Sequence, residues 1–284
     1  MARPVLVLFL LLVLLPCSPG AAAQAPVFDV HVHLRDGETS LLEYEAAVES
    51  AGIELDGLGA MWFGGPRQAL QGELDETRAG NDGVIALAAN RPEVLPIATV
   101  HPYDGQAALD ELARVAARGV KVLKIHAHTQ KFDVSDPRVL ALARRAGELG
   151  VVVLMDNANI LPGDSEKLFN LAVQSPGTRF LFAHMGAMNF RFWNVLALAR
   201  TADGFALRNV YFDISATVLL AADSPIEQEF VWTLRNVGID HVLLGSDYPQ
   251  MTLAQTVEAF ERLDLTADEK ARIRSGNARR LFGR

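Results

Sequence analysis

The sequence predicts a parallel (β/α)8 barrel. Short β-rich runs alternate with longer helical patterns along the chain, and no break in composition divides them. Half of the residues (50%) are hydrophobic, which is enough to build a large core. Residues 26–284 are expected to form this one domain, and their number suits a barrel, which typically needs about 250 residues. A doubly wound open sheet is the alternative, but no Gly-rich phosphate loop follows a strand.

Residues 1–25 are expected to be a signal peptide. Arg3 precedes an apolar run at 5–15, and alanines at 21–25 offer A-x-A cleavage sites. The run is too short for a membrane span, which needs about 20 residues, so no stable membrane insertion is expected. The protein is therefore expected to be periplasmic or secreted. The single cysteine, Cys17, leaves with this peptide; its lipidation is the alternative, disfavoured by Pro16.

The first four β/α units follow from runs of β-forming residues and the patterns after them. The second strand stops at Gly64, Gly65 and Pro66. The segment 107–118 has an apolar stripe at helical spacing, and Asp136 before Pro137 is a typical helix start. Strands are expected at 28–34, 58–63, 94–100 and 120–126, and helices at 74–89, 107–118 and 137–149.

The second half repeats the pattern and closes with an extra helix. Thr266 with Glu269 three residues later predicts a capping box at the start of that last helix. Strands are expected at 151–155, 179–183, 210–214 and 241–244, and helices at 165–173, 192–201, 226–236, 253–263 and 267–281.

Imidazoles and carboxylates gather where these strands end. In a barrel, the carboxyl ends of the strands build the active site, and buried charges there need a partner or a metal. The residues at the strand ends are His31, His33, Trp62, His101, Lys124, His126, Asp156, Asn157, His184, Ser215 and Asp247.

Alternation along the strands indicates which of these side chains share a face. Asp29, His31 and His33 are expected on one face of the first strand, with apolar residues on the other. The same reasoning directs Lys124 into the barrel and puts Asp247 on one face of the eighth strand with Leu243 and Gly245. A His-x-His pair alone is also compatible with an ordinary half-buried strand, so the pair needs the other strand ends to indicate a metal site.

Taken together, four motifs resemble those of the amidohydrolase superfamily. They are Asp-Val-His-Val-His at 29–33, Ala-His-Met-Gly at 183–186, Gly-Ser-Asp-Tyr-Pro at 245–249 and the ending at 277–283. The resemblance is nearest to the amidohydrolase-related branch, which holds metal-dependent hydrolases and nonoxidative decarboxylases. It covers essentially all of residues 26–284.

The resemblance implies a divalent metal held by His31, His33 and Asp247. It also implies that His184 is a ligand or a catalytic group. The family's fifth-strand histidine is replaced here by Asp156, which remains a candidate ligand, directly or through water. Zinc is the expected ion, with manganese or another divalent ion as alternatives, and one ion is expected rather than two.

Lys124 has two interpretations. In two-metal relatives a lysine on the fourth strand is carboxylated and bridges the ions. The favoured interpretation is instead a buried lysine paired with Asp156 or Asp247.

The remaining candidates concern the pocket. His126 and His128 could line it, and Arg191 could bind a substrate carboxylate. His101 is expected to be structural, and His241 lies at the opposite end of the barrel. Trp62 and Tyr248 are expected either to shape the pocket or to pack in the core.

The sequence therefore predicts a metal-dependent hydrolase of a small amide, lactone or carboxylic ester. Asp247 would move the proton and His184 would polarise the carbonyl. A decarboxylase on the same scaffold and a ligand-binding barrel without catalysis are the alternatives. The expected partner is a small molecule, and a homo-oligomer is compatible with the sequence. The net charge of −8, without a basic block, argues against nucleic acid.

Overall fold

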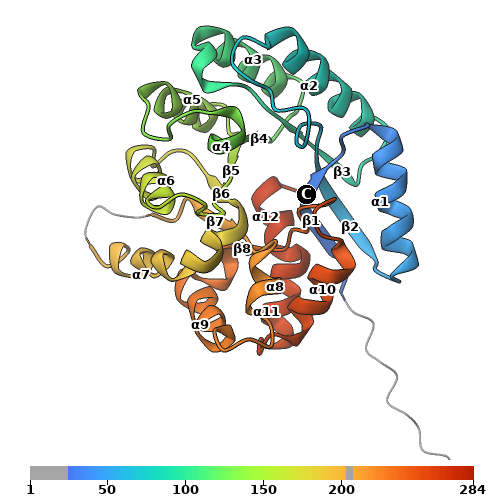
Figure 1. Cartoon of the computed structure of the whole chain (residues 1–284), viewed down its shortest axis with the longest axis vertical. Coiled ribbons are helices and arrows are strands. Elements are labelled where there is room, and N and C mark those ends of the chain that lie inside the picture. Colours follow the sequence, from blue (N-terminus) through green and yellow to red (C-terminus); the bar gives the residue numbers. More distant parts are fainter. Residues whose placement is uncertain (1–24, 203–206) are drawn as a thin grey trace, which may run out of the picture.

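The computed structural model describes residues 25–202 and 207–284. Its strands form one parallel sheet of eight, and each strand pairs with the next along the chain (Figure 1). Backbone hydrogen bonds from Val30 N to Leu244 O (3.1 Å) and from His33 N to Tyr248 O (2.9 Å) join the two edges, so the sheet closes into a barrel. The strands are β1 Val27–His33, β2 Leu55–Met61, β3 Val94–Ala98, β4 Val122–Ile125, β5 Val152–Met155, β6 Phe180–Phe182, β7 Val210–Asp213 and β8 Val242–Leu243.

Helices surround this barrel and cover its outer face (Figure 1). The predicted caps are present: Asp136 accepts a hydrogen bond from Arg138 N, and Thr266 forms a capping box with Glu269. The α-helices are α1 Glu38–Ser50, α2 Leu74–Ala88, α3 Gln106–Ala117, α4 Ala127–Gln130, α5 Pro137–Glu148, α6 Asp164–Gln174, α7 Val195–Ala199, α8 Thr217–Ala221, α9 Glu227–Val237, α10 Leu253–Arg262, α11 Ala267–Ala271 and α12 Asn277–Phe282.

Several helical regions differ from the sequence-based expectation, and the short helices α4 and α8 are additional. Helix α1 is additional, and only four of its thirteen residues (Ser40, Leu41, Tyr44 and Val48) are buried, so its apolar pattern is short. The helix expected at 192–201 is replaced by an irregular segment, Ala183–Asn194, which has 3₁₀ turns and non-helical dihedrals at 184–187, followed by the short α7. The last helix is interrupted by a π-helical turn, Arg272–Gly276, between α11 and α12. Further 3₁₀ turns lie at Pro102–Asp104 and Ile239–His241.

The predicted signal peptide falls almost entirely on residues 1–24, outside the described residues. Among the helices that the structure describes, none combines the length and the apolar character needed to cross a membrane.

Candidate metal centre

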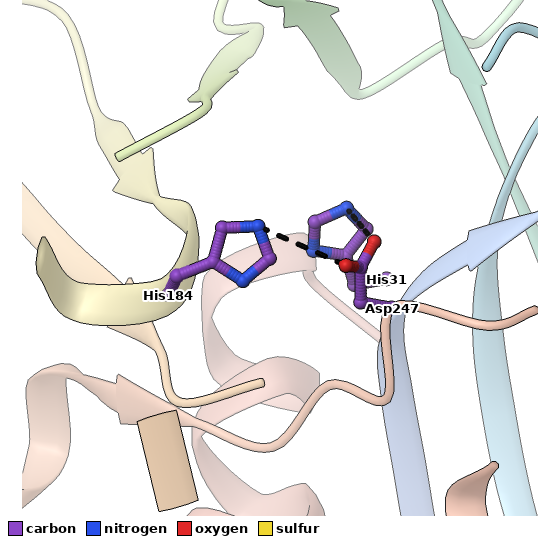
Figure 2. A group of neighbouring side chains, drawn as sticks. All are labelled: His31, His184 and Asp247. Carbon is purple, nitrogen blue, oxygen red and sulfur yellow. Dashed lines mark ion pairs between the residues drawn. The ribbon is translucent and has the colours of Figure 1, made fainter. Parts of the chain in front are cut away.

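Three side chains from distant parts of the chain meet at the carboxyl end of the barrel. His31 comes from β1, His184 from the segment after β6 and Asp247 from the segment after β8 (Figure 2). His31 Nε2 lies 3.3 Å from Asp247 Oδ1, and His184 Nε2 lies 4.0 Å from Asp247 Oδ2. One donor atom from each residue lies within 4.8 Å of the others, a spacing at which one cation could be shared.

His33 extends this group. Its Nε2 lies 3.3 Å from His31 Nε2 and 3.4 Å from Asp247 Oδ1. The two histidines of β1 therefore project to the same side of the strand, as the alternation predicts, and both face the carboxylate of Asp247.

The opposite ring nitrogen of each histidine is held by the protein. Nδ1–H of His31 donates to Asp213 Oδ2 (3.1 Å), and that of His33 donates to the carbonyl of Phe63 (2.6 Å). His184 Nδ1 lies 3.2 Å from the carbonyl of Ser215. Carboxylate and carbonyl oxygens only accept, so they place the hydrogen on Nδ1 and leave Nε2 of His31 and His33 as acceptors.

The donor set fits a divalent cation. Two Nε2 lone pairs and a carboxylate oxygen face one another at 3.3 to 3.4 Å, an arrangement that a cation between the atoms would stabilise. Burial and the charge of Lys124 lower the pKa of His31 to about 4, so its ring is neutral, as a ligand must be. Hydrogen bonds to the outer nitrogen are the usual support of metal-binding histidines.

Asp156 lies on the other side of His184. Its Oδ1 is 3.4 Å from His184 Nε2 and 3.5 Å from His126 Nε2. Burial lowers the pKa of His184, but the hydrogen bond to Asp156 and the nearby carboxylates outweigh it and raise the pKa to about 9. In this arrangement Asp156 holds a proton on His184.

The carboxylate of Asp247 is ionised and the imidazole of His126 is neutral. Burial raises the pKa of Asp247, but His31, His33 and His184 outweigh it and lower the pKa to about 2, so this carboxylate is ionised. Burial lowers the pKa of His126 to about 4. The Nδ1 of His126 is buried and has no hydrogen-bond partner among the described residues.

Lys124 points into the barrel as predicted. Its side chain is 1% exposed, and Nζ lies 3.2 Å from His31 Nε2. The predicted ion pair with Asp156 or Asp247 is not formed, since within the described ranges no carboxylate oxygen lies within 4.0 Å of Nζ. Lys124 instead lies next to an imidazole, and burial lowers its pKa against the opposing effect of three aspartates.

The backbone around these donors is strained. His184, Met185 and Ala187 have φ values of 60°, 46° and 46°, and Asp247 has a φ of 65°. Residues other than glycine rarely adopt this left-handed region, and such strain is concentrated at functional sites. Two of the donor residues are thus held in conformations that their own backbones disfavour.

Asp213 and Arg35 are site residues that the sequence analysis missed. Asp213 is fully buried and binds His31 Nδ1, His184 N and Ser215. A signal for it was present, since an aspartate interrupts the apolar run at 210–214. Arg35 lines the cavity in front of the donors, and it lies just beyond the end of β1, where loop geometry decides its direction.

The prediction for Asp29 is wrong. Its carboxylate accepts hydrogen bonds from Tyr44 of α1 (2.8 Å) and from Ser246 Oγ (2.6 Å), so it does not face the cluster with His31 and His33. The pairing of β1 with β2 shifts register between Asp29 and Val32, and this irregularity breaks the simple alternation.

Arg191 is also placed differently from its prediction. It pairs with Glu229 of α9 at 2.7 Å and stacks over Phe190, so it does not line the cavity. His128 pairs with Asp164 at 2.9 Å, again outside the cavity lining. The segment after β6 continues as a 3₁₀ coil, which carries Arg191 away from the barrel mouth.

The other candidates have structural roles. His101 contacts the carbonyl of Gln130 at 2.6 Å, and Trp62 donates to Asn81 at 3.0 Å. Tyr248 packs against Tyr44, and His241 contacts the carbonyl of Val210 at the opposite end of the barrel.

The donors line a cavity of about 250 Å³ at the barrel mouth. Besides His31, His33, His184 and Asp247, the lining includes Lys124, Arg35, His126, Gln68 and Asp156. This volume suits a small molecule rather than a polymer.

Several solved structures share this fold. The chain is 18% identical to 5-carboxyvanillate decarboxylase from Sphingomonas paucimobilis (TM-score 0.69), covering 92% of this chain and 99% of that one. A Staphylococcus aureus protein, provisionally named an amidohydrolase, is 17% identical (TM-score 0.72; 92% and 100% covered). A dihydroxybenzoic acid decarboxylase from Polaromonas sp. JS666, with bound manganese and 2-nitroresorcinol, is 15% identical (TM-score 0.64; 92% and 97% covered).

Fold and donor set together define a (β/α)8 barrel of the metal-dependent enzyme class. The family model Amidohydro_2, described as amidohydrolase, matches residues 28–284, and the chain belongs to this family. A search of curated proteins finds no match. Family membership confirms the resemblance that the motifs of β1, β6 and β8 predict.

Proposed function

We propose that the protein is a metal-dependent hydrolase of a small amide, lactone or carboxylic ester. The observation that supports this best is the convergence of acceptor atoms from His31, His33 and Asp247, backed by Nδ1 contacts that direct Nε2 inward. These residues would hold the ion, with Asp156 as a further ligand, directly or through water, while His184 keeps its proton. Zinc is our first choice, and manganese, bound in the Polaromonas structure, is the alternative.

A bound divalent ion supplies Lewis acidity, which polarises a carbonyl and lowers the pKa of water from 15.7 towards about 7. Asp247 is ionised and accepts the proton of the attacking water at one of its carboxylate oxygens. Its Oδ1 faces His31 and His33 while Oδ2 faces His184, so the same carboxylate can deliver that proton to the leaving group. His184, kept protonated by Asp156, donates a hydrogen bond to the developing oxyanion.

A decarboxylase is the second candidate, because several solved structures with this fold are named decarboxylases. The cavity also offers the basic side chains of Arg35 and Lys124, which suit a substrate that carries a carboxylate. In this reaction the bond from carbon to the carboxylate breaks, carbon dioxide leaves, and protonated His184 donates a proton to the carbon, either directly or through the carboxylate of Asp247.

We further propose that the mature protein begins near residue 26 after export to the periplasm or the medium. Sequencing the amino terminus of the exported protein tests this, and a mature chain that retains residues 1–25 would contradict it.

The function is tested with the protein loaded with zinc or manganese. We expect stoichiometric metal and turnover of a lactone, ester or amide, followed as acid release at constant pH. His31→Ala should lose both, whereas His241→Ala, a histidine at the far end of the barrel, should keep both. Release of carbon dioxide from hydroxybenzoates, without hydrolysis, would favour the decarboxylase, and metal binding without turnover would favour the ligand-binding barrel.

A further inference from the structure

A second and larger cavity lies beside α1 and α2. Its volume is about 660 Å³, within the range of about 300 to 1,000 Å³ typical of small-molecule sites. One face of α2 lines it, together with Trp62 at the end of β2 and the segment that leads into α1. Both helices lie outside the first strands of the barrel (Figure 1), so this cavity is separate from the metal donors.

Two arginines of this cavity lack acidic partners. Arg67 donates to the carbonyl of Arg35 at 3.0 Å, and within residues 25–202 and 207–284 neither guanidinium pairs with a carboxylate. The Nε of Arg35 is buried and has no hydrogen-bond partner in the same part of the chain. Of the two acids in the lining, Glu38 pairs with Arg91 and Glu76 is exposed. The cavity therefore offers two guanidiniums to an anion.

The rest of the lining is apolar. Trp62, Val84 and Leu87 contribute the larger surfaces, and Trp62 lies against Gly80. A Cβ at Gly80 would lie 2.3 Å from the indole ring, so packing requires glycine there.

Gly83 lies one turn further along α2, and packing does not require glycine at this position. A Cβ at this position would meet nothing within 4 Å, although glycine inside a helix is less stable than alanine by roughly 1 kcal/mol. The chain's own packing therefore does not explain Gly83. A ligand that approaches the helix backbone closely would explain it, because a side chain there would project into the cavity.

We propose that this cavity binds a small organic carboxylate with an aromatic or branched apolar body. The guanidiniums of Arg35 and Arg67 bind the carboxylate. The apolar part of the ligand lies against the backbone at Gly83 and contacts Trp62, Val84 and Leu87. Arg35 also lines the metal cavity, so the second site adjoins the first. This inference concerns binding alone and does not depend on the reaction at the metal centre.

Calorimetric titration of the full, metal-loaded chain with naphthalene-2-carboxylate tests the proposal. We expect saturable binding of one molecule per chain, and about tenfold weaker binding of naphthalene-2-carboxamide, which lacks the charge. Gly83→Leu fills the cavity and Arg67→Gln removes one cation, so each should weaken binding by about tenfold or more while metal content stays unchanged. Arg145→Gln, an exposed arginine of α5, is the matched control and should bind as the unmodified chain does.

Unchanged affinity in Arg67→Gln and Gly83→Leu would place the carboxylate elsewhere and overturn the proposal, as would the absence of saturable binding. If Gly83→Leu does not fold, the more exposed Arg67→Gln and the carboxamide decide the result. Loss of hydrolysis in any of these proteins does not bear on it, because binding is measured directly.

Discussion

The orientation of each imidazole depends on a residue far away in the sequence. His31 belongs to β1, whereas Asp213, which binds its Nδ1 at 3.1 Å, belongs to β7. Asp213 also accepts hydrogen bonds from the backbone N–H groups of His184 and Ser215. One buried carboxylate therefore positions parts of the metal centre contributed by β1 and by the segment after β6. Its pKa is held well below the usual range by His31 and His184 against the effect of burial, so it is ionised.

Replacing Asp213 with Asn should weaken metal binding by about 10 to 100-fold, the usual effect of losing such a supporting residue. The amide is neutral, so it no longer makes Nε2 of His31 more basic. Competition with a chromogenic chelator measures the affinity, and circular dichroism verifies folding. Asp240→Asn, at the opposite end of the barrel, is the control. A folded Asp213→Asn protein with unchanged affinity would show that Asp213 does not support the metal centre.

The same dependence on distant residues explains what the sequence could predict of the site. His31, His33, His184 and Asp247 were identifiable because each follows from strand alternation or from a strand end. Asp213, which orients His31, was not identifiable, because the pattern of a strand does not show which side chains from other strand ends it meets. Asp29 and Arg191 were placed wrongly, because a register shift and a 3₁₀ coil are local irregularities with weak sequence signals.

At the scale of elements, α2 and α3 are joined by a buried polar network around Glu111. Asn81 of α2 donates to Glu111 Oε1 at 2.8 Å, and Arg114 donates to both carboxylate oxygens at 2.7 and 2.8 Å. Asn81 also accepts from the indole of Trp62 at 3.0 Å. This network therefore ties two outer helices to the end of β2 and to the wall of the second cavity.

The stability contributed by Glu111 should depend on pH. Burial raises its pKa, but Arg114 and Asn81 outweigh burial and hold the pKa below the usual value. A carboxyl whose pKa is lower in the folded chain stabilises fully above its unfolded value of about 4.3, and this contribution is lost as the pH falls through the folded value.

Glu111→Gln should therefore lower the free energy of unfolding by about 1 to 2 kcal/mol near neutral pH, allowing for the partly exposed arginines. The difference from the unmodified chain should shrink below about pH 4. Urea unfolding at both pH values measures it. Glu148→Gln, an exposed residue paired with Arg145, should change stability by less than about 0.5 kcal/mol. A difference for Glu111→Gln that grows on acidification would contradict the proposed ionised state.

Strands were easier to predict than the helices around them. The eight β runs are short, apolar and bounded by breakers, so their order and parallel pairing followed from the sequence pattern. The final helix reads as one periodic segment, but a π-helical turn interrupts it at Arg272–Gly276, where Ile273 and Arg274 are buried and the segment contacts β1 and β8. Tertiary contacts of this kind are not visible in periodicity.

At the scale of the molecule, the ends of the barrel meet at the metal centre. β1 pairs with the segment after β8 through hydrogen bonds that include Asp247 N to His31 O at 2.9 Å. The side chains of the same two residues face each other at 3.3 Å. An ion held there would link β1, the segment after β8 and the segment after β6, and so would add a contact across the junction at which the barrel closes.

Removing the metal should therefore lower the unfolding temperature of the whole barrel. An ion that binds only the folded chain adds about 2.7 kcal/mol when its concentration is 100 times Kd. For a chain of this size, that corresponds to a rise of roughly 5 to 10 °C. Calorimetric scans after chelation, and again after zinc or manganese is restored, measure the shift. His241→Ala should keep the metal-dependent shift and His31→Ala should lose it, because only His31 contributes a donor. Equal unfolding temperatures with and without metal in the unmodified chain would show that no ion links the two ends of the barrel.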